Sequence, residues 1–247
     1  YMKYIFVIAL VFAVSGCSGK TKGLILAAEN NNVAAQYQLA TMYANGGEVL
    51  KNPALAAKWF KRAAEQGLPE AQYNLALMLL KGEGVPQDFE QAFNWNLMAS
   101  VYGLPNAQFN LSLQYKQGDG IAADIDQAFD WALRAAEQGH LEAQYNVAVW
   151  YGVGDGVPID NDLSFKWYLE AAKQGHESAQ VIVGGRYTQG AGVERNYVRS
   201  YAWLSFSDSP LAQDYLLDVT TKMTEQEVAE AKAYALNCIR SEFKECN

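Results

Sequence analysis

Residues 71–95 read AQYNLALMLLKGEGVPQDFEQAFNW, and this stretch decides the fold. Apolar side chains in its first half recur at the spacing of one helix face. The residues expected on that face are Gln72, Leu75, Ala76 and Leu79. Gly82 follows where a chain leaving a helix needs a left-handed residue, and Asp88 is a good N-cap for a second helix. The stretch therefore predicts two short helices joined by a loop.

This helix pair recurs along the chain with a period of 36 residues. An Ala-Gln pair stands at Ala35-Gln36, Ala71-Gln72, Ala107-Gln108, Ala143-Gln144 and Ala179-Gln180. Tryptophan keeps the same step at Trp59, Trp95, Trp131, Trp167 and Trp203. Glycine keeps it at Gly46, Gly82, Gly118, Gly154 and Gly190. Units that bury their apolar faces only against their neighbours form solenoids. We therefore expect an all-α fold, a right-handed α-solenoid of five helix-pair repeats.

The ends of the second helices follow the same rule. Their expected N-caps are Asn52, Asp88, Asp124, Asp160 and Asn196. Their expected left-handed stops are Gly67, Gly103, Gly139 and Gly175, with Asn31 at the corresponding position before the first repeat. Local chemistry and the long-range period therefore predict the same boundaries.

The pattern A-Q-Y-N-L-A-x-M-x-x-x-G-x-G-V-x-x-D-x-x-x-A-x-x-W in residues 71–95 resembles the Sel1-like repeat, a relative of the tetratricopeptide repeat. The resemblance covers residues 27–206. Its fifth copy departs from the pattern with Gly184-Gly185 in mid-helix, which suggests looser packing there. Terminal helices close many proteins of this family, so residues 207–247 are expected to form capping helices. The second of these helices opens with a capping box at Thr224–Glu227.

Composition excludes several classes of protein. The chain has 247 residues, 50% of them hydrophobic, with 19 Lys and Arg against 27 Asp and Glu. This is too apolar for a disordered chain, and a general nucleic-acid binder needs a basic face. We therefore expect a folded protein that does not bind nucleic acid.

The N-terminal segment is typical of an export signal. Residues 4–14 form an apolar run after Lys3, and the run is too short to span a bilayer. The following Val14-Ser15-Gly16-Cys17 resembles the bacterial lipobox, which implies cleavage before Cys17 and a lipid on that cysteine. Ser18 then implies sorting to the outer membrane of a Gram-negative bacterium. We expect a signal peptide over residues 1–16 and a tether over 17–26; the alternative is an ordinary signal and a soluble periplasmic protein.

The remaining cysteines, Cys238 and Cys246, form an even pair in an exported chain, which predicts a disulfide. Eight residues of unbroken helix would separate their α-carbons by about 12 Å, and a disulfide allows roughly 4.4–6.8 Å. The helix must therefore end soon after Arg240.

Catalytic and metal-binding patterns are weak. Relatives rich in cysteine suggest a β-lactamase-like hydrolase, but the only Ser-x-x-Lys runs from Ser241 to Lys244 in the tail. His140 and His176 share a repeat position, and neighbouring repeats hold such residues about 10 Å apart. We expect no catalytic residues, no metal and no cofactor.

A groove for a protein or peptide partner is the favoured site. First-helix aromatics expected to face it are Tyr37, Tyr73, Phe109 and Tyr145, and the asparagines beside them are Asn74, Asn110 and Asn146. Trp150 lies off the tryptophan register and is expected near the surface as an anchor. Two alternatives remain: the aromatics pack between repeats, or exposed aromatics stack cell-wall glycan. The predicted function is an adaptor that binds proteins.

Overall fold

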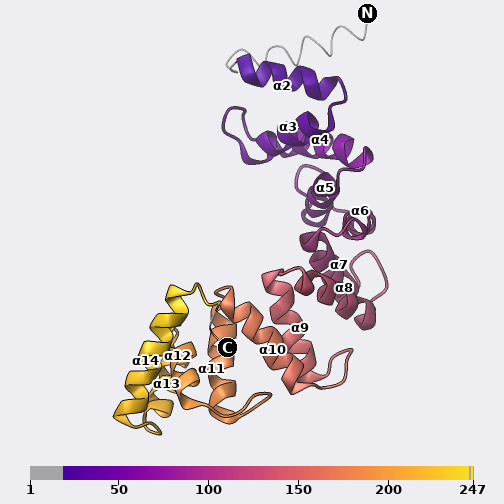
Figure 1. Cartoon of the computed structure of the whole chain (residues 1–247). Helices are drawn as coiled ribbons and strands as arrows, with labels where there is room; N and C mark the ends of the chain where they lie inside the picture. The colour runs from indigo at the N-terminus through magenta and orange to yellow at the C-terminus, as the bar shows by residue number, and fades with distance from the viewer. Residues whose placement is uncertain (1–18, 245, 247) are drawn as a thin grey trace, which may run out of the picture. The chain divides into compact units, whose positions relative to one another are not determined.

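The computed structural model describes residues 19–244 and residue 246 (Figure 1). The signal segment and Cys17 lie outside these residues. Within them there are thirteen helices and no β-strand, so the predicted all-α solenoid of helix pairs is confirmed. None of these helices is both long and apolar enough to cross a membrane. The chain divides into two compact units between Ala123 and Asp124, which we call unit 1 and unit 2.

Unit 1 is built from one helix followed by helix pairs. Its helices are α2 (Gly19–Glu29), α3 (Val33–Asn45), α4 (Pro53–Glu65), α5 (Pro69–Lys81), α6 (Phe89–Val101) and α7 (Pro105–Gln117). Each helix packs on the next along the chain. Residues 19–26, expected to act as a tether, belong to α2, whose buried Ile25 and Ala28 join the hydrophobic core with α3.

Unit 2 continues the same order. Its helices are α8 (Ile125–Glu137), α9 (Leu141–Val153), α10 (Asn161–Lys173), α11 (Glu177–Gln189), α12 (Tyr197–Leu204), α13 (Pro210–Thr220) and α14 (Glu225–Arg240). Consecutive helices from α8 to α13 pack together, and α14 returns to pack on α12. The expected capping helices are therefore present as α13 and α14.

The predicted helix boundaries follow from local hydrogen bonds. The Asp88 carboxylate accepts from the backbone amide of Gln91 at 2.9 Å, and the other four predicted N-caps make the equivalent bond. Gly82 ends α5 in the left-handed region at φ 68°. Asn31 takes φ 61°, as predicted for the one stop that lacks a glycine. The capping box of Thr224 and Glu227 is also confirmed.

The repeated glutamine joins neighbouring repeats. The buried Gln72 Nε2 donates to the backbone oxygen of Ala64 at 3.3 Å, where the last carbonyls of α4 have no partner within the helix. The same bond recurs from Gln36 to Ala28, Gln108 to Ser100, Gln144 to Ala136 and Gln180 to Ala172. The glutamine of each repeat therefore adds a side-chain hydrogen bond to a carbonyl at the end of the preceding helix, which also accepts from a backbone amide.

The second glycine of each loop permits a close backbone approach between repeats. A Cβ on Gly84 would overlap the backbone of Pro53, and one on Gly192 would overlap that of Asn161. The first repeat has Glu48 at the corresponding position, and its carboxylate accepts from Thr21 Oγ1 at 2.6 Å. Its loop therefore meets α2 through a hydrogen bond.

Gly184 is closely packed, so the expectation of looser packing at Gly184-Gly185 is wrong for the first of these glycines, while a Cβ on Gly185 would meet no atom within 4 Å. A Cβ on Gly184 would lie 2.6 Å from Leu204 Cγ. Ser200 Oγ also donates to the Gly184 carbonyl at 2.8 Å. The glycine allows α12 to approach α11 closely.

The C-terminus folds back as predicted. Helix α14 ends at Arg240, and turns bring Cys246 to Cys238, with their α-carbons 5.3 Å apart and their sulfurs bonded. Both cysteines are buried in the core of unit 2, next to Trp203 and Phe243.

Candidate functional site

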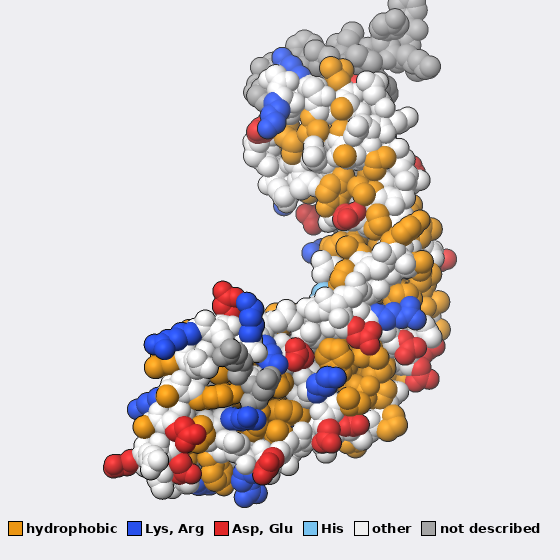
Figure 2. All heavy atoms as spheres, viewed as in Figure 1, with side chains coloured by type: hydrophobic (Ala, Val, Ile, Leu, Met, Phe, Trp, Pro, Cys, Tyr) orange, Lys and Arg blue, Asp and Glu red, His pale blue; other side chains and the backbone are white. Residues whose placement is uncertain are grey.

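The predicted groove residues lie at two adjoining depressions in unit 1. The larger, about 630 Å³, lies between α2 and α3; the smaller, about 220 Å³, lies between α3 and α5. Tyr37 and Thr41 line both. Hydrophobic side chains reach the surface over unit 1 between few charges (Figure 2). We call the smaller depression the unit 1 groove.

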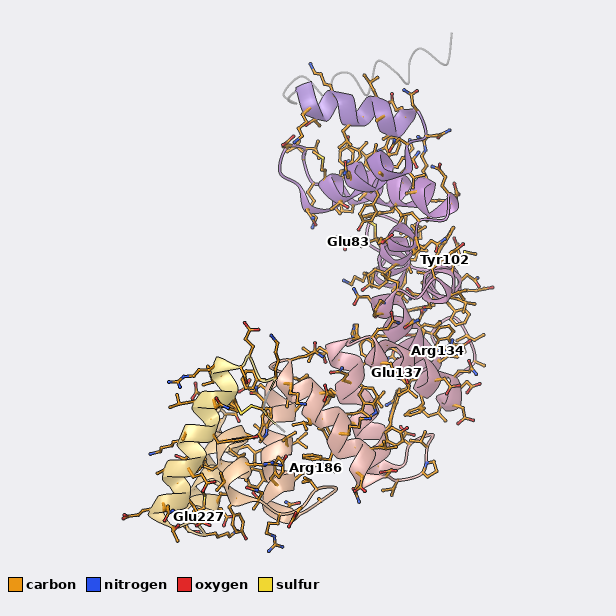
Figure 3. The ribbon with its side chains drawn as sticks, in the orientation of Figure 1. Glu83, Tyr102, Arg134, Glu137, Arg186 and Glu227 are labelled. Carbon is orange, nitrogen blue, oxygen red and sulfur yellow. A yellow bond between two sulfur atoms is a disulfide. The ribbon has the colours of Figure 1, made fainter. Side chains whose placement is uncertain are left out.

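The unit 1 groove has an apolar floor and polar ends. Phe60, Leu77 and Met78 line the floor. Lys81 and Glu83 also line it, and Glu83 lies 3.8 Å from Lys51. Figure 3 labels Glu83 in the loop after α5. Such a surface suits a ligand with an apolar side chain and polar backbone on either side.

The aromatic and asparagine columns bond to each other across repeats. Asn74 Nδ2 donates to the Glu70 carbonyl at 2.7 Å and lies 3.4 Å from the Tyr37 hydroxyl. Burial raises the pKa of Tyr73, although its hydrogen bond with Asn110 opposes this shift. All four residues in these two pairs are half-buried. The columns therefore contribute to repeat packing and also present an edge to solvent.

In unit 2 the equivalent tyrosine has two aromatic neighbours. Tyr145 stacks on His176 with ring centroids 4.4 Å apart and meets Tyr168 edge-on at 5.5 Å. It also lines a depression of about 420 Å³ with Ile182 and Leu211. Phe109 and Asn146, the remaining predicted groove residues, are half-buried.

Trp150 is a core residue, so the expectation of a surface anchor is wrong. Its exposed fraction is 2%, and its ring lies 5.8 Å from that of Phe129. The residue 36 positions earlier, Gln114, is equally buried. At the same repeat position Met78 is also buried, whereas Met42 and Arg186 are half-buried. Of the expected groove residues, Trp150 alone is excluded.

Most of the regular tryptophans also belong to the core. Trp59, Trp131 and Trp203 are buried, while Trp95 and Trp167 are half-buried. Arg62 and Arg134 lie over the rings of Trp59 and Trp131 at 4.7 and 4.5 Å. These indoles stabilise the repeats, which disfavours the glycan-stacking alternative.

The two histidines cap helices. His140 Nδ1 accepts from the Ala143 amide, and His176 Nδ1 accepts from the Ala179 amide, both at 3.2 Å. Burial lowers the pKa of His140, with Glu142 opposing that shift. Sequence reasoning missed this role, although the position directly before a first helix was a signal for it.

Arg186 is a second residue that sequence reasoning missed (Figure 3). It donates to Ser164 Oγ at 2.9 Å and lies over the Tyr168 ring at 5.2 Å. Burial lowers its pKa, and burial raises that of Tyr168 to about 12. The contacts of Arg186 with Ser164 and Tyr168 join α10 to α11.

Comparisons with known proteins identify the family. The Sel1 repeat model matches residues 33–68, 69–100, 105–140, 141–176 and 178–206, so the chain belongs to the Sel1 repeat family. It is similar to the crystal structure of a Sel1 repeat protein from Oxalobacter formigenes, with 32% identity and a TM-score of 0.74 over 81% of this chain and 58% of the other.

A second similar structure is c5321, a protective antigen of uropathogenic Escherichia coli strains with an SLR fold. It shares 25% identity and a TM-score of 0.53 over 92% of this chain and 65% of the other. The present chain thus spans about three fifths of the length of both proteins. No curated protein matches it.

Proposed function

We propose that this chain is a non-enzymatic adaptor that binds a protein or peptide, held by a lipid at Cys17 on the periplasmic face of a Gram-negative outer membrane. Sel1 repeat proteins are in general scaffolds for protein interactions. The lipobox-like sequence supports the anchor. The bonded pair Cys238–Cys246 supports an oxidising compartment.

The unit 1 groove is the observation that carries the binding role. It joins an apolar floor to the polar edge of Tyr37 and Asn74, and Lys81 lies at its end. Its residues are aromatic, aliphatic and amide groups that bind by burial and hydrogen bonding. The expected ligand is a segment with one large apolar side chain for Leu77 and Met78.

Photocrosslinking in cells tests this binding role. A photoreactive amino acid at Leu77 should capture a discrete partner, whereas the same residue at Met98, which is 47% exposed on α6, should not. Lys81→Glu should reduce capture severalfold without moving the thermal midpoint. Equal capture from Leu77 and Met98, or none from either, would contradict the groove assignment.

Fractionation tests the anchor. Cys17→Ser should release a soluble protein that lacks lipid mass, while the unaltered chain stays with the outer membrane. A soluble, unmodified form of the unaltered chain would instead indicate an ordinary secretory signal.

A further inference from the structure

Helix α2 occupies the place of a repeat's second helix. The Ala28 carbonyl accepts from Gln36 Nε2 at 3.1 Å, as Ala64 accepts from Gln72 in the following repeat. The sequence supports the same register, since Ala-Ala-Glu at residues 27–29 recurs 36 residues later. Among the described residues, α2 is thus half of a repeat, without the first helix that precedes every other second helix.

Within residues 19–244, no helix covers the face that such a first helix covers elsewhere. Phe60 and Met78 are 3% and 7% exposed in the complete repeat, whereas Leu24 and Met42, 36 residues earlier, are only half-buried. The depression of about 630 Å³ lies on this face and is lined mainly by α2 and α3. We call it the half-repeat site.

The complete repeat shows what covers this face. There α3 supplies four lining residues, Tyr37, Thr41, Ala44 and Asn45, opposite Phe60 and Leu77. Their spacing is one face of a helix. An occupant of the half-repeat site must therefore be helical and carry a stripe like that of α3, a tyrosine followed by smaller side chains.

We propose that the half-repeat site binds an amphipathic α-helix of a partner protein, which takes the position of a first helix. Gln38 stands 36 residues before Asn74, so a tyrosine of the incoming helix can meet it as Tyr37 meets Asn74. Lys20 stands where Ala56 is fully buried. A helix that covers Lys20 must supply an acidic residue, because an unpaired buried ammonium is costly.

The acidic residue belongs near the end of the incoming helix. Helices α3 and α4 run antiparallel through a short loop, and Ala44 and Asn45 line the same depression as Pro53, the first residue of α4. Lys20 lies one turn further along the corresponding helix, α2. The partner helix is thus specified by a tyrosine in its first half and a carboxylate in its last turn.

The proposed cleavage before Cys17 removes the chain's own first residues from this position, so this inference rests on the export signal of the proposed function. In the repeat register those residues would otherwise fit, because Tyr1 and Ile5 stand where Tyr37 and Thr41 line the unit 1 groove. In a second copy, the described first helices already pack on second helices. A partner's helix is therefore the occupant that we propose.

A synthetic peptide can test the site on the protein that begins at Cys17. The probe is a helix-stabilised, fluorescent peptide with the sequence of α3, VAAQYQLATMYAN, bearing Ala44→Glu. We expect saturable binding by fluorescence anisotropy, at least tenfold weaker in the protein variant Met42→Glu. The matched control Val101→Glu, at a position 70% exposed on α6, should bind within twofold of the unaltered protein.

A charge swap keeps the test independent of folding, because Lys20 is exposed. Lys20→Glu should weaken binding of the Ala44→Glu peptide at least threefold and strengthen binding of a peptide with Ala44→Lys. Absent or unsaturable binding to the chain cleaved before Cys17, or equal binding to all variants, would overturn the proposal. Capture from Leu77 would persist in those cases if the adaptor role is right, so the two proposals fail separately.

Discussion

Units 1 and 2 differ in the residues that stabilise the start of a repeat's first helix. In unit 1, α5 and α7 begin after Leu68 and Leu104 with Pro69 and Pro105, and proline needs no partner for its nitrogen. Only α3 of that unit has a side-chain cap, from Asn32. In unit 2, His140 and His176 occupy that position and cap the helix with a side chain. The same backbone geometry is therefore stabilised either by a proline at the first helical position or by a histidine cap that can bind a proton.

The units also differ in charge. Residues 19–123 carry 8 basic and 8 acidic side chains, whereas residues 124–247 carry 10 basic and 19 acidic ones. Charged side chains are correspondingly dense on the visible face of unit 2 (Figure 2). We conclude that acid, salt and reduction should act mainly on unit 2, and the predictions below test this asymmetry.

The largest expected effect comes from Trp150→Ala in unit 2. Removing an indole that is 2% exposed should lower the free energy of unfolding by about 3–5 kcal/mol. Met78→Ala, at the same repeat position in unit 1, should cost less because the deleted volume is smaller. Chemical denaturation of both variants measures this. An unchanged midpoint for Trp150→Ala would contradict the assignment of Trp150 to the core.

Trp150 shows where reasoning from sequence stops. Its repeat position reads Met42, Met78, Gln114, Trp150 and Arg186, a mixture that resembles a surface column. The structure buries Gln114 by pairing it with Asn96 Nδ2 at 2.6 Å. Asn96 itself stands where other repeats have Phe60 or Tyr168. A polar residue at one repeat position is thus paired with a polar residue at another. Comparing the residues at a single repeat position does not reveal such a pair.

The junctions were predictable because their causes are local. Asp88, Gly82 and the Thr224–Glu227 box act within a few residues of themselves. Helix α2 was missed even though its Ala-Ala-Glu recurs 36 residues later. It was missed because its neighbours Lys20 and Leu24 replace the Ala56 and Phe60 that mark a complete repeat.

The next effect comes from opening the bond between Cys238 and Cys246. A loop of this length should stabilise the fold by about 2–3 kcal/mol in the chain-entropy model. Cys238→Ser with Cys246→Ser should lower the midpoint of unit 2 and leave amide exchange in residues 71–76 unchanged. Two titratable thiols in denatured, unreduced protein would show that the bond does not form.

A smaller effect is expected from mild acid. Burial lowers the pKa of His140, so below its ordinary value of about 6.5 the unfolded chain binds the proton first. The cap's contribution is therefore complete above that pH and is lost as the pH falls towards the folded pKa. The loss should be about 1 kcal/mol, the usual worth of an N-cap.

A variant with the junction sequence of unit 1 isolates the pH-dependent contribution of the His140 cap. His140→Leu with Leu141→Pro reproduces the junction at Leu104-Pro105 and should flatten part of the stability profile between pH 7.5 and 5. Exchange at residues 143–146 should become less dependent on acid in this variant. Identical profiles in both proteins would show that the His140 cap does not couple to protonation.

The smallest effect is expected from salt. Unit 2 has more acidic than basic side chains, and these carboxylates repel one another through water. Added salt shortens the Debye length and so weakens this repulsion. Raising the salt concentration from 0.05 to 0.5 M should stabilise unit 2 by up to about 1 kcal/mol, since exposed charges interact weakly. Unit 1, with balanced charge, should change less. Hydrogen exchange resolves the two, and equal protection gains in both units would mean that their difference in charge has no thermodynamic consequence.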